Sequence, residues 1–222
     1  MAKPQITLYV DIVSPFAYLA FHVLRTSPLF ADCDVTYIPI FLGGVMKACG
    51  NTPPIRIKNK DKWIERERNR WARLFNVPIS DTVPEGFPPN TLAVQRALSV
   101  IATESPALLP DALAALYRVF WVEGRNVVDE AVMGGALAEV VGREAVEGVL
   151  EKSKDVGKKA LTANTERALE EGCFGLPYFL ATNAKGEQEN FWGFDHLGQV
   201  VDHLGIGRAQ GSGVESGWRA ML

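Results

Sequence analysis

Ser14 occupies the position in this chain that best suits chemistry. It follows an apolar run over 6–13, rich in β-branched and aromatic residues, and it precedes Pro15. This pattern is typical of a strand that runs into a helix, with serine as the N-cap and proline at the first helical position. Such a helix start directs backbone N–H groups and the positive end of the helix dipole at whatever lies beside Ser14. A bound thiolate would be stabilised there.

A second motif, Gly175-Leu176-Pro177-Tyr178, lies far along the chain. It places a proline just before another predicted strand, where a cis peptide bond would expose backbone donors and acceptors to a peptide-like ligand. Taken alone, each motif is equally consistent with an ordinary N-cap or an ordinary turn. Their order and separation favour a shared site.

Composition limits the classes of protein open to this chain. Its 222 residues, 47% of them apolar, suffice for one large domain or for one core with a substantial insertion. The net charge of −3 gives no electrostatic reason to expect nucleic acid or a membrane surface as a partner. The apolar runs are far shorter than a bilayer span, and the first residues lack the layout of a signal peptide. We therefore expect a soluble intracellular protein.

The thiol and imidazole side chains are few and scattered. The three cysteines form no CxxC motif, and their odd number argues for a reducing compartment without a disulfide framework. Together with the three histidines they offer no metal-ligand spacing, so no metal is expected. These residues are Cys33, Cys49, Cys173, His22, His196 and His203.

The hydrophobic pattern predicts strands at both ends of the chain and helices between them. Segments 6–13, 15–24 and 35–40 indicate a strand, a helix and a strand, which suggests a βαβ unit. A charged helix over 58–75 and a Pro-rich linker over 83–89 follow. The remaining predicted elements are helices over 92–103, 110–122, 130–141 and 144–153, a long helix closing at Gly172, strands over 178–182 and 189–192, and a last helix over 196–204.

This order of elements predicts an α/β fold, namely a thioredoxin-like sheet interrupted by an all-helical insertion. Neither end of the chain has enough strands for a stable sheet, so the two ends have to pair. We expect a discontinuous thioredoxin-like domain over 1–57 and 158–206 and a helical insertion over 58–157 that overhangs Ser14. The Gly/Ser-rich segment 207–222 is predicted to be a flexible tail.

With these motifs placed, the chain resembles the kappa class of glutathione transferases. That class is grouped with the bacterial 2-hydroxychromene-2-carboxylate isomerases in the DsbA-like branch of the thioredoxin fold. The similarity covers about residues 5–204. The segments that carry it are 11–16, 43–47, 50–54, 172–177 and 192–195.

The resemblance implies that Ser14 donates a hydrogen bond to the sulfur of glutathione and favours its thiolate. In redox relatives the first cysteine of a CxxC motif stands at this position. A serine hydroxyl is a poor free nucleophile but a good donor to an anion at a helix start. Because Ser14-Pro15-Phe16-Ala17 replaces CxxC, disulfide exchange at this site is not expected.

The resemblance also assigns the other contacts to glutathione. Leu176, before Pro177, would pair through its backbone with the cysteinyl part, as a strand edge does. Asn51 would form a hydrogen bond with the glutathione backbone, although it also suits a turn before Pro-Pro. Lys60 would contact a glutathione carboxylate; the alternative is that it is a solvated surface charge. Asp195 would meet the γ-glutamyl ammonium, with the N-cap of the last helix as a competing or shared role.

Phe194 departs from the family pattern, which has a small polar residue before the aspartate. One γ-glutamyl contact at this position is therefore in doubt, and glutathione affinity is expected to be reduced. Cys173 fits a small buried residue, and Asp11 a buried carboxylate beneath the site.

An electrophile pocket is expected where the helical insertion overhangs Ser14. Aromatic residues at helical spacing are more often part of a core, so only some of the candidates are expected to touch a ligand. The candidate wall residues are Phe16, Phe41, Met46, Trp63 and Trp121.

Three functions follow from this pattern. The first is a kappa-type glutathione transferase, in which the thiolate attacks a small hydrophobic electrophile. The second is a glutathione-dependent isomerase, in which the thiolate adds reversibly and glutathione is not consumed. Segment 70–78 slightly favours the isomerases, and segment 50–54 favours the transferases. The third is a non-catalytic binding module that has kept the fold, which Phe194 and the missing CxxC would permit.

The resemblance further implies a homodimer. The compartment is left open between cytosol, mitochondrion and peroxisome. The last three residues, Ala220-Met221-Leu222, share a small first residue and a final leucine with a peroxisomal signal but lack its middle base.

Overall fold

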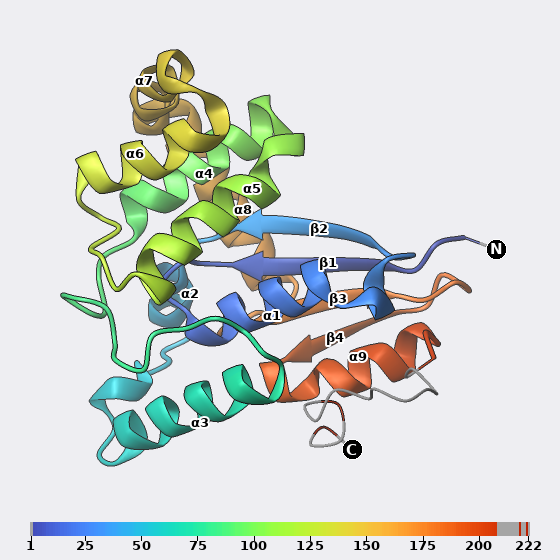
Figure 1. The fold of residues 1–222 in the computed structure, drawn as a ribbon. Helices are drawn as coiled ribbons and strands as arrows, with labels where there is room; N and C mark the ends of the chain where they lie inside the picture. Colours follow the sequence, from blue (N-terminus) through green and yellow to red (C-terminus); the bar gives the residue numbers. More distant parts are fainter. Residues whose placement is uncertain (1, 208–217, 219–220, 222) are drawn as a thin grey trace.

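A mixed four-stranded sheet forms the centre of the molecule (Figure 1). The computed structural model describes residues 2–207, 218 and 221. The strands lie in the order β2-β1-β3-β4, with β1 parallel to β2 and antiparallel to β3, and β3 antiparallel to β4. Strands from both ends of the chain thus share one sheet, which confirms the predicted fold class. Their bounds are β1 (Gln5–Val10), β2 (Asp34–Pro39), β3 (Tyr178–Thr182) and β4 (Gln188–Trp192).

The alternation of side chains along β1 divides the core between the two faces of the sheet. Leu8 and Val10 belong to the larger cluster, which includes residues of α1 (Pro15–Thr26) and α9 (Leu197–Leu204). Tyr9 belongs to the smaller cluster, with residues of α2 (Leu42–Ala48) and α8 (Lys158–Glu170). Both faces of β1 are therefore covered by apolar residues of neighbouring helices.

The middle of the chain forms a helical block beside the β2 edge of the sheet (Figure 1). Short 3-10 turns cover Pro28–Phe30, Pro54–Arg56, Pro106–Leu108 and Phe194–His196. Two π-helical segments, Arg118–Val122 and Ser153–Gly157, continue the ends of α5 and α7. The helices of the block are α4 (Leu92–Glu104), α5 (Leu109–Tyr117), α6 (Glu130–Val141) and α7 (Arg143–Lys152).

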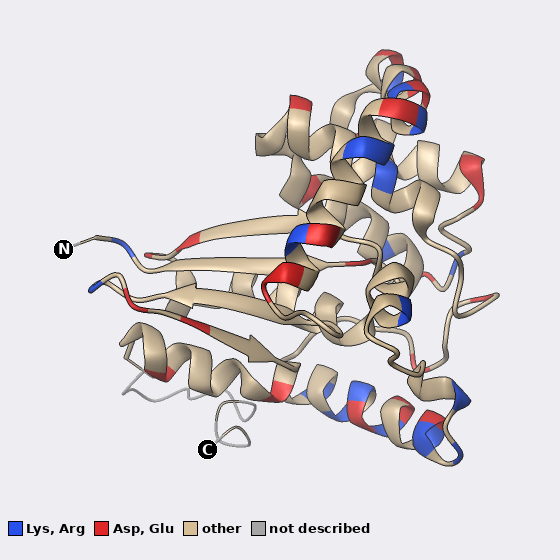
Figure 2. Cartoon of the chain, turned by 180° about the vertical axis from the view of Figure 1, so that it is seen from behind, with Lys and Arg blue, Asp and Glu red and all other residues tan. Residues whose placement is uncertain are grey.

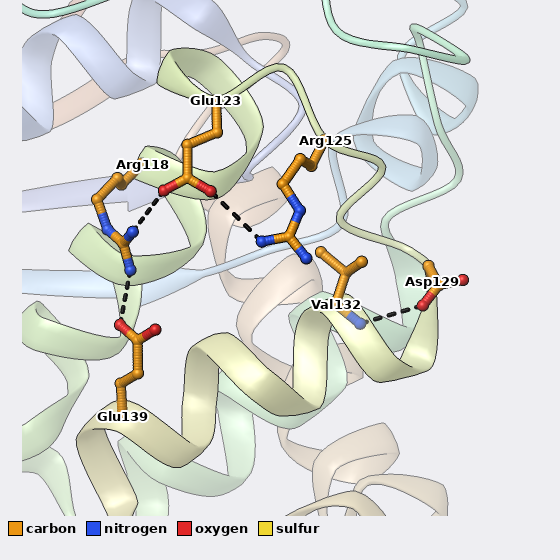
Figure 3. Close-up of polar contacts among 6 residues, drawn as sticks. All are labelled: Arg118, Glu123, Arg125, Asp129, Val132 and Glu139. Atoms are coloured by element: carbon orange, nitrogen blue, oxygen red, sulfur yellow. Dashed lines mark hydrogen bonds and ion pairs between the residues drawn. The ribbon is translucent and has the colours of Figure 1, made fainter.

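Exposed ion pairs link the end of α5 to α6 within this block (Figure 3). Arg118 contacts Glu123 and also Glu139, the latter at 2.6 Å. Asp129 caps α6, because its carboxylate accepts hydrogen bonds from the N–H groups of Ala131 and Val132 at 2.9 and 3.0 Å. Exposed pairs of this kind contribute only about 0–1 kcal/mol each, so the buried apolar residues do most to hold the block together.

The charged helix α3 (Lys60–Leu74) lies apart from the helical block and along α1 (Figure 1). Figure 2 shows its acidic and basic residues side by side along the helix. Its apolar side meets the turn before α9: the rings of Trp71 and Phe75 lie 5.6 and 5.2 Å from that of Phe194. Aromatic rings therefore make the contact between the C-terminal end of α3 and the turn before α9.

Most of the predicted tail lies outside the described residues, as do Ala220 and Leu222 of the suggested targeting signal. Trp218, which is described, is buried, with its ring 5.1 Å from that of Phe75. Among residues 2–207, 218 and 221, no helix is long and apolar enough to cross a membrane.

Two local differences from the predicted elements bear on the site. β1 ends at Val10 and not at Val13, because the Asp11 carbonyl accepts a hydrogen bond from the Ser14 N–H and turns the chain. The helix α2 was not predicted, since Gly43 and Gly44 in its first turn are poor helix formers.

Candidate functional site

Ser14 is the N-cap of α1, as predicted from the sequence. Its Oγ accepts a hydrogen bond from the Ala17 N–H at 3.2 Å, and Pro15 occupies the first helical position. No acidic residue lies in the first turn of α1, so no side-chain charge there offsets the positive end of the helix dipole. Among the described residues, neither the Ser14 hydroxyl hydrogen nor the Phe16 N–H has an acceptor. Two donors at the helix start are therefore available to an anion.

A cavity of about 410 Å³ opens beside Ser14. Most of its walls are apolar, with few polar side chains, among them Ser14, Asn51 and Thr91. Side chains from α1, α2 and α3 and from the segment before α4 contribute to it. A small, largely apolar ligand with a few polar groups suits such walls.

The loop before β3 forms another part of the cavity wall. Gly175 and Leu176 line the cavity, and the Leu176–Pro177 peptide bond is cis. In the described part of the chain, the Leu176 N–H and C=O take part in no hydrogen bond. They can pair with an extended peptide backbone, as the edge of a strand does.

Asp11 lies beneath the site, fully buried, at the turn between β1 and α1. Its carboxylate accepts hydrogen bonds from Thr91 Oγ1 at 2.7 Å, Gln95 Nε2 at 2.8 Å, the Leu42 N–H at 2.9 Å and the Val13 N–H at 3.2 Å. Burial raises the pKa of Asp11, and these hydrogen bonds partly offset that rise. The carboxylate thus joins the Ser14 turn to the starts of α2 and α4.

Three of the five predicted wall residues, Phe16, Phe41 and Met46, line the cavity. Trp121 does not: it is completely buried, and its indole N–H donates a hydrogen bond to the Ile12 carbonyl at 2.9 Å. Trp63 does not line the cavity either, since its side chain is 54% exposed on α3, whereas its neighbour Ile64 faces the cavity.

Not all of the residues predicted to contact glutathione line the cavity. Asn51 lines the cavity, and its Nδ2 donates to the Phe174 carbonyl at 2.9 Å. Lys60 is exposed at the start of α3 and is not among the wall residues. The Phe194 side chain is only 1% exposed and packs into the aromatic cluster of α3, away from the cavity. Asp195 is exposed beside His196 and caps no helix, because Gly193 precedes the 3-10 turn and His196 precedes α9.

Sequence reasoning missed the segment before α4 as part of the site. It was predicted only as a Pro-rich linker, but residues 87–91 line the cavity and include a second cis peptide bond, Phe87–Pro88. Phe87 also packs edge-on against Trp121, with ring centroids 5.5 Å apart. The cluster of prolines was the available signal, since it indicates a rigid segment. It does not indicate toward which part of the fold that segment is directed. Trp192 was also missed as a wall residue.

The described residues contain no cluster of three or more His, Cys, Asp or Glu side chains arranged to hold a metal ion.

The fold and the site together define a thioredoxin-fold protein of the DsbA-like kind, in which a serine stands at the helix start that faces the cis-proline loop. The family model for the DSBA-like thioredoxin domain matches residues 5–205. The chain therefore belongs to this family.

Individual relatives confirm the resemblance found in the sequence. The chain is 27% identical to glutathione S-transferase kappa 1 of Caenorhabditis elegans over 90% of this chain and 91% of that protein. It is 28% identical to 2-hydroxychromene-2-carboxylate isomerase of Pseudomonas putida over 90% of this chain and 94% of that protein. A solved structure of a 2-hydroxychromene-2-carboxylate isomerase superposes with a TM-score of 0.76 at 24% identity, covering 90% of this chain and 94% of the other. The last comparison shows the shared fold.

Proposed function

We propose that this protein is a glutathione transferase of kappa type. The observation that carries the proposal is the Ser14 hydroxyl at the start of α1, in the wall of an apolar cavity, whose hydrogen has no acceptor among the described residues. Glutathione would lie along the Leu176 backbone with its sulfur at Ser14, and Asn51, Lys60 and Asp195 would contact its polar ends. The similarity to kappa-class transferases over nine-tenths of the chain supports this assignment.

The chemistry follows from the thiol pKa. A free thiol with a pKa of about 8.5 is mostly protonated at neutral pH, and only the thiolate is a strong nucleophile. Donation from the Ser14 hydroxyl and the Phe16 N–H favours the thiolate, as does the positive end of α1. The bound thiolate then attacks an electrophilic carbon held in the cavity, a carbon–sulfur bond forms, and the leaving group departs with its electron pair.

A second candidate function is a glutathione-dependent isomerase. The specific observation in its favour is the similarity to 2-hydroxychromene-2-carboxylate isomerases, which covers 90% of this chain. In that reaction the same thiolate adds to an unsaturated carbon, a bond rotates, and the thiolate leaves again. Glutathione is regenerated, so the two candidates differ in whether thiol is consumed.

A stoichiometric assay separates these functions. The protein is incubated with glutathione and either an activated chloronitrobenzene or a cis α,β-unsaturated carboxylate, and thiol and electrophile are measured in parallel. A transferase consumes one thiol for each thioether formed. Conversion of the unsaturated acid without thiol loss would assign the isomerase. Conversion of neither compound at saturating glutathione would favour the non-catalytic binding module.

A further inference from the structure

Two of the three cysteines meet in the structure although 124 residues separate them. The thiol of Cys49 lies 3.6 Å from the carbonyl oxygen of Cys173. Cys49 is exposed at the C-terminal end of α2, and Cys173 is buried in the turn that follows α8. The third cysteine, Cys33, precedes β2, at the end of the sheet opposite Ser14.

The pair lies at one rim of the candidate active site. Asn51, two residues after Cys49, lines the cavity, as does Gly175, two residues after Cys173. The two segments are already joined by the hydrogen bond from Asn51 to the Phe174 carbonyl. Any covalent change in the pair therefore acts directly on the wall that includes Leu176.

We infer that Cys49 and Cys173 form an oxidisable thiol pair that glutathione disulfide closes to a disulfide, and that the closed form binds glutathione less tightly. The effect on affinity rests on the proposed function, whereas the formation of the disulfide does not. No CxxC motif is needed, because the fold brings together two cysteines that the sequence holds apart.

The order of reaction follows from burial. The Cys49 thiolate, which is exposed, attacks glutathione disulfide, so that a mixed disulfide forms and one glutathione leaves. Cys173 is the weaker starting nucleophile, because burial raises the pKa of its thiol to about 11. Held beside Cys49, it then attacks the Cys49 sulfur and releases the second glutathione. Overall, two protein thiols and one glutathione disulfide give one protein disulfide and two glutathione thiols, the protons passing to the released thiolates.

Closing the bond has a structural consequence at the cavity. In the reduced protein the Cys173 thiol donates a hydrogen bond to the Gly175 carbonyl at 3.4 Å. A disulfide sulfur carries no hydrogen, so this hydrogen bond is lost when the S–S bond forms. The Gly175 carbonyl then loses its donor, and the adjoining Leu176 backbone, which is the proposed strand edge for glutathione, moves with it.

Thiol counting tests the pair directly. Wild type and the variants Cys49→Ser, Cys173→Ala and Cys33→Ser are treated with glutathione disulfide, the remaining thiols are alkylated, and the intact masses are measured. Wild type should retain one alkylated thiol and carry no glutathione adduct. Cys33→Ser should retain no alkylated thiol, and Cys49→Ser should retain both of its remaining thiols in alkylated form. Cys173→Ala should hold a stable glutathione adduct at Cys49. Retention of all three thiols in wild type, or a wild-type adduct that never resolves, would overturn the inference.

The effect on the site is measured by calorimetry of glutathione binding. The oxidised wild type should bind roughly tenfold more weakly than the reduced form, a typical size for coupling between two sites, and dithiothreitol should restore the affinity. Cys33→Ser should behave as wild type, and Cys49→Ser should be insensitive to glutathione disulfide. Equal affinity of the two forms overturns the regulatory part. If even the reduced protein binds no glutathione, the proposed function fails, while the thiol counts still decide the pair.

Discussion

The hydroxyl of Thr91 donates a hydrogen bond to the buried carboxylate of Asp11 at 2.7 Å. Asp11 belongs to the turn that presents Ser14, and Thr91 immediately precedes α4 and lines the cavity. Together with the hydrogen bond from Gln95 to the same carboxylate, this contact joins the turn that presents Ser14 to the helical block at the point where the candidate site lies. The Thr91 hydroxyl therefore ties this part of the cavity wall to the Ser14 turn.

Replacing Thr91 by valine should lower the free energy of unfolding. Valine has the same shape but leaves a buried charge with one donor fewer, which costs about 1–3 kcal/mol. Urea denaturation at neutral pH measures the loss. Thr91→Ser, which keeps the hydroxyl, is the matched control and should lose clearly less; equal losses in both variants would show that the methyl group and not the hydrogen bond matters.

Asp11 should make the protein less stable as the pH rises from the acid side. Burial raises its pKa in the folded state above the ordinary value of 3.8, so the folded protein binds more protons than the unfolded chain between these two values. The unfolding free energy of wild type relative to Asp11→Asn should therefore fall as pH rises through that window and then level off. Denaturation of both proteins across pH tests this. If the unfolding free energy of wild type relative to Asp11→Asn instead grows with pH, the hydrogen bonds lower the pKa of Asp11 by more than burial raises it.

Phe194 should stabilise the fold through its side chain rather than contact glutathione with it. Its ring is buried against Trp71 and Phe75, so Phe194→Ala should cost about 3–5 kcal/mol of stability. Phe194→Leu, which keeps most of the apolar volume, should cost less and bind glutathione as wild type does. A leucine variant with normal stability but lost glutathione affinity would instead place the ring at the binding site.

Neighbouring residues of α3 should differ in their effect on the second substrate. Ile64 lines the cavity, whereas Trp63 is 54% exposed and does not. Ile64→Ala should therefore raise the KM for the electrophile about tenfold or more, since a single methylene group in an apolar pocket is worth about 1–3 kcal/mol. Trp63→Ala should leave that KM unchanged. The opposite pattern in steady-state kinetics would move the electrophile to the outer side of α3.

The elements that frame the site could be predicted from local sequence. A β-branched run followed by Ser14 and Pro15 has few readings other than a strand, an N-cap and a helix, and the structure confirms it. The helix α2 could not be predicted in the same way, because Gly43 and Gly44 have low helix propensity and their placement depends on tertiary contacts. The carboxylate of Asp11 is one such contact, since it accepts a hydrogen bond from the Leu42 N–H.

The cavity walls were predicted only where they lie close to the motifs. Phe16 and Phe41 follow the first two strands closely and line the cavity, as their neighbourhood suggested. Trp121 was misplaced because its orientation is set by a hydrogen bond to Ile12, 109 residues away, and by the π-helical segment that contains it, neither of which helical periodicity reveals. Long-range packing of other segments likewise places the Cys49 thiol beside the Cys173 carbonyl.

The central claim is that Ser14 stabilises the thiolate of bound glutathione. Ultraviolet absorption of the thiolate, followed across pH at saturating glutathione, measures its pKa in wild type, Ser14→Ala and Asp129→Ala. Asp129→Ala is the matched control: like Ser14→Ala it removes an N-cap side chain, which costs about 1 kcal/mol of stability. The hydrogen bonds of Asp129 lie within α6. We predict a thiol pKa below that of free glutathione in wild type and in Asp129→Ala, raised by about 1–2 units in Ser14→Ala, which corresponds to one hydrogen bond to a charged group. The same thiol pKa in wild type and Ser14→Ala, or no saturable thiolate signal in wild type, would contradict the account.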